Sequence, residues 1–264
     1  MGGSVRARRD EADERIGWLV FDHPERRNAI SVDMWREIPR ALRQLADDDA
    51  VRVVVMRGAG DVAFVAGADI SEFGEQRTGG TAAASYDADS GRAFGALANL
   101  EKPLIAMIQG FCVGGGVAIA LSADLRFASD DSVFAVPAAR LGLGYQMGGL
   151  AALVNLVGPS RAKEIFFTAR RFDAAEALAM GLVNGVVPRP ALPGLVLETA
   201  ERIAGNAPLT IRSVKRIVAE LARDPSERDL DAVEASIRAC FESEDYREGV
   251  KAFLSKRAPR FRGR

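Results

Sequence analysis

The chain has 264 residues, of which 48% are hydrophobic, and its formal net charge is −1. This length suits one large domain or a core with a smaller lobe, and the balanced charge gives no overall field that would attract nucleic acid or a membrane surface. The two cysteines provide no disulfide framework, and a single histidine excludes a metal site built on two histidines and weakens any Ser-His-Asp proposal.

The N-terminal segment and the first strand are predicted from charge and apolar pattern. Residues 1–14 carry charges of both signs and no apolar signal core, so we expect a short disordered leader. Residues 16–21 predict a strand, and Ser31 is expected to cap a helix that runs to about Leu45. No stretch reaches the apolar length needed to span a membrane, so a cytoplasmic protein is expected.

The middle of the chain predicts buried strands joined by small-residue segments. A near-continuous apolar run over residues 51–56 and another over residues 103–108 are typical of strands covered on both faces. Residues 78–84 are mostly glycine, threonine and alanine, which suggests a mobile loop beside a site. Asp173 and Glu176 have the spacing of an N-cap and N3 pair for a short helix.

Beyond Pro190 only helical patterns follow, at about residues 195–204, 209–221, 229–241 and 246–256. Strands alternating with helices, followed by helices alone, predict an α/β core over residues 1–190 and a helical lobe over residues 191–264. The last residues, 256–264, are basic and are expected to form a solvated tail. The alternative is that this tail contacts an anionic cofactor on a neighbouring subunit.

Two small-residue turns each follow an apolar strand. Residues 105–118 run from a strand through Gly114-Gly115-Gly116 into a small-residue helix, where free backbone N–H groups favour negative charge. Ala66-Gly67 follows the strand at residues 51–56. A glycine triplet alone is also typical of a tight strand–helix junction. Two such turns together could converge on one oxyanion and form a catalytic device made of main chain.

The order and separation of these turns resemble the enoyl-CoA hydratase/isomerase family, also called the crotonase superfamily. The resemblance covers nearly the whole chain, in segments 22–31, 66–69, 114–116, 122–126, 166–183 and 244–257. It implies an α/β, crotonase-like spiral of ββα units with a C-terminal helical lobe. It also implies a homotrimer or a dimer of trimers.

The family's substrate is an acyl-CoA thioester, so the resemblance implies coenzyme A as part of the substrate, with no separate cofactor and no metal. By position, the thioester oxygen would lie between the backbone N–H groups of Ala66 and Gly115. The residues implied in contacts with substrate or coenzyme A are Arg26, Asn28, Ala29, Ala68, Asp69, Ile70, Gly114, Phe253 and Lys256. The last two would reach over from the helical lobe of this or another subunit, or else belong to an ordinary amphipathic terminal helix.

The sequence departs from the family's hydratases at both glutamates that activate water. Ala118 and Ala138 stand at those two positions. Alanine cannot transfer a proton, and general acid–base help is worth roughly 10² to 10⁴ in rate. A standard hydratase mechanism is therefore not expected.

Two segments resemble the methylmalonyl-CoA decarboxylases of the superfamily, residues 141–145 and 243–249. In those enzymes a tyrosine at the place of Tyr145 holds the substrate carboxylate, whereas here Tyr145 could also be an aromatic wall of the acyl pocket. Ala68 and Ala118 stand where the decarboxylases keep a histidine and a glutamate. These two differences limit the resemblance.

Three functions stay open at this point. The first is an acyl-CoA lyase of decarboxylase-like or other non-hydratase type that acts through an enolate. The second is hydration or isomerisation of an enoyl-CoA by relocated groups, and the third is a non-catalytic acyl-CoA binder. Nucleic acid and membrane partners are not expected, because no basic-aromatic platform or apolar span is present.

Overall fold

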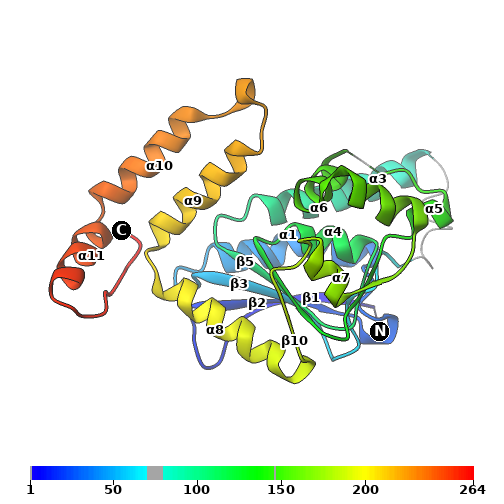
Figure 1. Cartoon of the computed structure of the whole chain (residues 1–264), viewed down its shortest axis with the longest axis horizontal. Helices are drawn as coiled ribbons and strands as arrows, with labels where there is room; N and C mark the ends of the chain where they lie inside the picture. The colour runs from blue at the N-terminus through cyan, green and yellow to red at the C-terminus, as the bar shows by residue number, and fades with distance from the viewer. Residues whose placement is uncertain (1, 70–79, 146) are drawn as a thin grey trace.

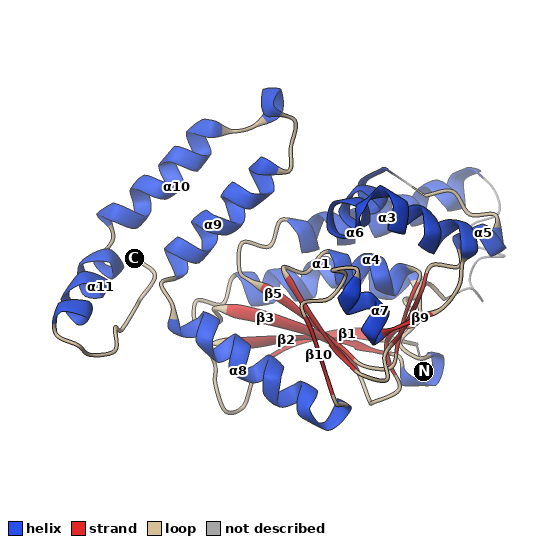
Figure 2. Ribbon diagram, viewed as in Figure 1, coloured by secondary structure: helices blue, strands red, loops and turns tan. Residues whose placement is uncertain are grey.

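Two β-sheets organise the chain in a computed structural model that describes residues 2–69, 80–145 and 147–264. The larger sheet has the order β1 (Ser4–Arg9), β2 (Ile16–Asp22), β3 (Val53–Gly58), β5 (Leu104–Ile108), β7 (Leu125–Ser129) and β10 (Gly185–Val187). The smaller sheet has the order β4 (Ala63–Val65), β6 (Phe111–Val113), β8 (Val133–Ala135) and β9 (Phe172–Asp173). Neighbouring strands run parallel except in the pairs β1–β2 and β8–β9 (Figure 2).

The chain spirals between these sheets in repeated ββα units. The pairs β3–β4, β5–β6 and β7–β8 each give one strand to the larger sheet and the next to the smaller one, and a helix follows. The helices of this part are α1 (Val32–Ala46), α3 (Gly80–Ala98), α4 (Gly115–Leu121), α5 (Ala138–Leu141), α6 (Met147–Thr168) and α7 (Ala174–Ala179). Short 3₁₀ helices are η1 (Pro24–Arg26), η3 (Arg189–Ala191) and η4 (Pro225–Glu227). The expected spiral of ββα units is confirmed.

Local sequence signals account for most of these elements. The Ser31 hydroxyl accepts a hydrogen bond from the backbone N–H of Met34 and caps α1, whose apolar stripe is buried in spite of Pro39. The Asp173 carboxylate accepts a hydrogen bond from the N–H of Glu176 at 2.8 Å, so the predicted cap of α7 is confirmed. Strands β3 and β5 are buried almost throughout, because both faces of the larger sheet are covered.

Helix α8 (Leu192–Gly205) covers one face of the larger sheet. Leu192, Val196, Ala200 and Ala204 recur at a spacing of four and pack against apolar side chains of β2, β3 and β5. Helices α9 (Pro208–Leu221), α10 (Leu230–Glu242) and α11 (Glu244–Leu254) instead project away from both sheets (Figure 1). We therefore propose to place the division between core and lobe after α8 rather than at residue 190.

In the part of the chain that the structure describes, no helix is long and apolar enough to cross a membrane.

Two sequence expectations about irregular segments are wrong. The expected leader forms the edge strand β1, which pairs antiparallel with β2 over all of its six residues. Val5 and Ala7 pack on the core while Arg6 and Arg8 face solvent, and this alternation was the strand signal hidden among the charges. A loop was expected at residues 78–84, but residues 80–84 form the first turn of helix α3. Residues 78 and 79 lie outside the described residues.

The C-terminal tail is exposed over most of residues 256–264, as expected, but its backbone is held in place. The buried carboxylate of Asp245 accepts hydrogen bonds from the backbone N–H groups of Arg262 at 2.6 Å and Gly263 at 2.7 Å. The Arg52 guanidinium of the core donates to the carbonyl oxygen of Phe261 at 2.7 Å. The tail thus connects the helical lobe to the core.

The tail predicts a pH dependence of stability at Glu248. The Arg257 guanidinium, with help from the Arg260 N–H, lowers the pKa of Glu248 from 4.5 to about 2. A folded-state pKa below the unfolded one stabilises the fold above the unfolded pKa, and this contribution is lost as the pH falls from 4.5 toward 2. Glu248→Gln should therefore flatten the free energy of unfolding against pH in that window, measured by urea denaturation. Glu234→Gln, an exposed carboxylate on α10, is the control and should leave the profile unchanged.

Candidate functional site

The two small-residue turns lie beside each other at the carboxyl ends of β4 and β6. These strands are parallel neighbours in the smaller sheet, so the residues that follow them leave the sheet at the same edge. A Cβ atom built on Gly115 would lie 3.5 Å from the backbone nitrogen of Ala68 and 3.7 Å from the carbonyl carbon of Gly67. The two turns therefore approach each other through bare backbone, as their sequences predict.

Glycine is required at two positions for this approach. Gly114 has φ 53° and ψ −113°, a conformation that residues with a side chain rarely adopt. A Cβ atom on Gly116 would lie 2.1 Å from the carbonyl oxygen of Val65, so any side chain there would push α4 away from β4. The glycine triplet thus sets both the direction and the distance of the α4 backbone.

The backbone hydrogen bonds of turn 66–69 correct the expected donor. The Ala66 N–H donates to the carbonyl oxygen of Arg27 at 3.1 Å, so Ala66 is not available to a substrate. Ile30 pairs with the turn on both sides of Ala68: its N–H donates to Gly67 at 2.8 Å and its carbonyl accepts from Asp69 at 2.9 Å. Because successive backbone groups of an extended chain alternate in direction, the Ala68 N–H faces away from Ile30 and toward Gly115. Among the described residues neither Ala68 nor Gly115 has an acceptor for its N–H.

Asn28 is buried and its side chain is hydrogen-bonded within the chain, and its predicted contact with coenzyme A stays a prediction. Its side chain is 1% exposed and donates to the carbonyl oxygens of Ala59 at 2.9 Å and Ala63 at 2.8 Å. Its amide oxygen accepts from the His23 N–H at 3.0 Å. The neighbouring Ala29 is also buried, and its carbonyl is in contact with the His23 ring.

The other predicted contacts are in part accessible. Arg26 is exposed beside this loop, and Ala68 and Asp69 are half-buried at the turn. The Gly114 N–H donates to the carbonyl oxygen of Ala135 at 2.8 Å, so Gly114 shapes the turn and does not donate to a substrate. Ile70 lies outside the described residues.

Phe253 and Lys256 are far from the glycine-rich turns within one chain. They belong to α11 and the residues after it, at the end of the helical lobe, whereas α4 lies in the core (Figure 1). Phe253 is 84% exposed and Lys256 is exposed. Their predicted contact with coenzyme A therefore needs a neighbouring chain and stays a prediction.

The two alanines expected at the glutamate positions differ in burial. Ala118 is half-buried on α4, and Ala138, at the start of α5, is 5% exposed within the main hydrophobic core.

Cys112 is a buried free thiol whose pKa is raised by burial, so it is no thiolate nucleophile. In the ranges that the structure describes, no group of three His, Cys, Asp or Glu residues could hold a metal ion.

Tyr145 lies in the segment between α5 and α6 and is 39% exposed. Its ring contacts Phe166 of α6 edge to face, with the ring centroids 4.7 Å apart. Pro137, directly before α5, lies beside the glycine triplet, because a Cβ atom on Gly114 would lie 4.0 Å from it. Tyr145 follows eight residues later in the chain and packs against α6 through Phe166.

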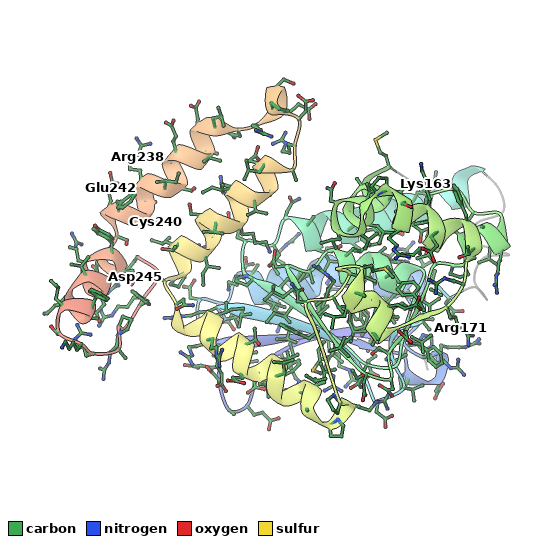
Figure 3. All side chains as sticks on the ribbon, in the orientation of Figure 1. Lys163, Arg171, Arg238, Cys240, Glu242 and Asp245 are labelled. Carbon is green, nitrogen blue, oxygen red and sulfur yellow. The ribbon has the colours of Figure 1, made fainter. Side chains whose placement is uncertain are left out.

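Two arginines that sequence reasoning did not select meet at Phe111 of β6. The Arg27 guanidinium lies 4.9 Å from the centre of the Phe111 ring, and that of Arg171 lies 6.0 Å from it. Arg171, labelled in Figure 3, directly precedes β9 at the edge of the smaller sheet. No local pattern could have paired these residues, since they are far apart in the chain.

Comparisons with known proteins agree on one family. The family model described as enoyl-CoA hydratase/isomerase matches residues 11–264. A short-chain-enoyl-CoA hydratase of Clostridium acetobutylicum is 35% identical over 255 residues, 94% of each chain. A carnitinyl-CoA dehydratase of Proteus mirabilis is 33% identical over 250 residues, 93% of this chain and 94% of the relative. The crystal structure of an enoyl-CoA hydratase/carnithine racemase from Magnetospirillum magneticum matches with a TM-score of 0.91 at 35% identity, over 100% of this chain and 97% of that one.

The role of Asn28 predicts a loss of stability. Asn28→Ala leaves the buried carbonyl of Ala63, the half-buried carbonyl of Ala59 and the N–H of His23 without these partners, which should lower the free energy of unfolding by about 3 kcal/mol in urea denaturation. Arg26→Ala, in the same loop but exposed, is the control and should stay within about 0.5 kcal/mol of the parent chain. Unchanged stability of Asn28→Ala together with weakened binding of coenzyme A would instead make Asn28 a ligand contact.

Proposed function

Because this chain belongs to the enoyl-CoA hydratase/isomerase family, we propose that it binds the thioester oxygen of an acyl-CoA between the N–H groups of Ala68 and Gly115. One observation carries this proposal: the Ala68 nitrogen lies 3.5 Å from the Cβ position of Gly115, and neither N–H group has an acceptor among the described residues. Two donors fixed in advance stabilise the negative charge of an enolate more than that of the ground-state carbonyl. Each donor contributes roughly 3 kcal/mol of transition-state stabilisation.

We propose a lyase reaction of decarboxylase-like or other non-hydratase type. Ala118 and Ala138 offer no carboxylate to hold or deprotonate a water, and Ala138 is packed among apolar side chains. A carboxylate relocated into that core would need a partner to offset its desolvation. The chain thus keeps a site suited to an enolate and lacks the usual groups for adding water.

Decarboxylation is compatible with this reduced set of groups. The bond between the α-carbon and the carboxylate breaks, its electron pair moves into the thioester as an enolate, and carbon dioxide leaves. The α-carbon then takes a proton from solvent. No general base is needed in the bond-breaking step, and Tyr145, held by Phe166, would orient the carboxylate.

A second candidate function is hydration or isomerisation of an enoyl-CoA. The names of the relatives favour it, since they include a short-chain-enoyl-CoA hydratase and a carnitinyl-CoA dehydratase. This chemistry requires a proton-transferring group at a new position. Asp69 is a half-buried carboxylate of turn 66–69 and would be the first to test.

For the nucleotide end of the substrate, we propose Arg26 as a contact within the chain and Phe253 and Lys256 as contacts from a neighbouring one. The helices α9, α10 and α11 expose large apolar side chains, among them Val218, Leu221, Phe241, Phe253 and Leu254. Such a surface is typical of subunit contacts. We therefore propose a homotrimer or a dimer of trimers, in which coenzyme A is part of the substrate and no further cofactor is used.

The donor assignment is tested by replacing single backbone amides with esters. An ester at Ala68 removes one N–H and keeps the side chain, so kcat on the converted CoA ester should fall about 100-fold. An ester at Ala66 is the matched control: it removes the hydrogen bond to Arg27, costs about 1 kcal/mol of stability and should leave kcat nearly unchanged. The reverse result would return the donor role to Ala66.

The reaction type is tested by mass spectrometry of the protein with a panel of CoA thioesters: saturated, enoyl, hydroxyacyl, malonyl and methylmalonyl. We expect loss of carbon dioxide from a malonyl-type ester, and a strong decrease of that turnover in Tyr145→Phe. Gain or loss of water would establish the hydratase reaction instead. Tight binding without any turnover would indicate an acyl-CoA binder.

A further inference from the structure

A cleft of about 360 Å³ lies between the core and the helical lobe. Its walls come from the residues before β3 and β5, from the connection between α8 and α9, and from the C-terminal tail. It shares no residue with the glycine-rich turns or with the loop around Arg26. Its volume is at the lower end of the range for sites that bind small molecules.

The charged side chains that line this cleft are mostly basic. Arg52, Lys102, Arg212 and Arg262 face one acidic residue of the lining, Asp49. Arg212 has one distant ion pair, at 3.9 Å from Glu101. Over residues 2–69, 80–145 and 147–264, the other three basic side chains form no ion pair. The carboxylates of Asp47, Asp48 and Asp49 lie near Lys102 and offset part of its charge. The side chains that line the cleft nevertheless carry an excess of positive charge.

Backbone carbonyls hold two of these cations in position. Lys102 donates to the carbonyl oxygens of Leu45 at 2.8 Å and Asp48 at 2.7 Å. Arg52 donates to those of Ala204 at 3.1 Å and Phe261 at 2.7 Å. The ammonium group of Lys102 is partly withdrawn from solvent, and this burial lowers its pKa. Cations fixed by neutral acceptors keep their charge for a further partner.

The tail brings in the fourth cation. Asp245 binds the backbone N–H groups of Arg262 and Gly263, and this anchors the tail at the cleft. The bond uses the backbone of Arg262 and leaves its guanidinium to the cleft. Core, lobe and tail thus each contribute at least one basic side chain.

We propose that this cleft binds a small oxyanion with several negative charges, a molecule that carries phosphate or carboxylate groups. Guanidinium groups bind phosphate and carboxylate groups alike through paired N–H donors, and the lysine ammonium adds a point charge. A ligand here would bridge the core at Arg52 and Lys102 to α9 at Arg212 and to the tail at Arg262. Its binding would therefore stabilise the attachment of the lobe to the core. The site is separate from the acyl-CoA site.

The test is isothermal titration calorimetry of the full chain with pyrophosphate and with citrate, in the presence of saturating coenzyme A. Coenzyme A occupies any phosphate-binding groups of the substrate site. We expect saturable binding of one anion per chain, and a rise in the thermal unfolding temperature with anion concentration. Tighter binding of pyrophosphate would identify phosphate as the ligand chemistry, and tighter binding of citrate would identify carboxylates.

Substitutions place the binding in the cleft. Arg212→Gln and Arg262→Gln should each weaken binding about tenfold, because each removes a charge-assisted hydrogen bond. Arg260→Gln is the matched control, an exposed arginine of the same tail that does not line the cleft, and should bind as the parent chain does. Thermal unfolding without anion checks that each variant is folded. If Arg262→Gln does not fold, Arg212→Lys replaces it in the test. This variant keeps the positive charge and should retain part of the affinity. Absence of saturable binding, or binding that both glutamine variants retain, would overturn the proposal.

Discussion

The pairing of turn 66–69 with loop 27–30 is the constraint on which the site depends. Arg27 and Ile30 take up the hydrogen-bonding groups of Ala66, Gly67 and Asp69, and the alternation of the backbone then directs the Ala68 N–H to the opposite side. Asn28 stiffens the same loop with three hydrogen bonds from its buried side chain. Gly116 lets α4 approach β4 closely enough to bring Gly115 to this N–H. The geometry of the proposed thioester site is thus a product of backbone pairing between segments.

The same construction would leave the proposed thioester site intact without glutamates at positions 118 and 138. The N–H of Ala118 donates to the carbonyl oxygen of Gly114 at 3.2 Å, but this is a backbone hydrogen bond, so the side chain at position 118 could change without removing it. The methyl group of Ala138 extends the hydrophobic core at the start of α5. In the proposed function, stabilisation of an enolate by backbone N–H groups and transfer of a proton by a side chain would therefore be structurally separate.

The helical lobe depends on a different kind of contact. Helix α8 is held to the larger sheet by apolar burial, whereas α9–α11 lie beyond the sheet and are attached through polar contacts of α9 and of the tail. Lys215 of α9 pairs with Asp124 of the core at 2.8 Å, and Arg52 and Asp245 hold the tail. Positive charge accumulates at this junction because the two bodies meet there with basic residues from both. The junction thus both attaches the lobe to the core and forms the basic cleft.

The sequence by itself determined the elements whose signals are local. The Ser31 and Asp173 caps, the continuous apolar runs of β3 and β5, and the four helices after Pro190 could all be predicted because neighbouring residues encode them. The family resemblance added the spiral and the two turns. Edge strand β1 was missed, since charged residues on its outer face hid the alternation of Val5 and Ala7. Only the tertiary structure decided that Ala68 rather than Ala66 has the free N–H, that Asn28 is a brace, and that four basic residues between positions 52 and 262 meet in one cleft. The physical reason is that a hydrogen bond or a charge cluster depends on which distant segments touch, and no local period of the sequence records that.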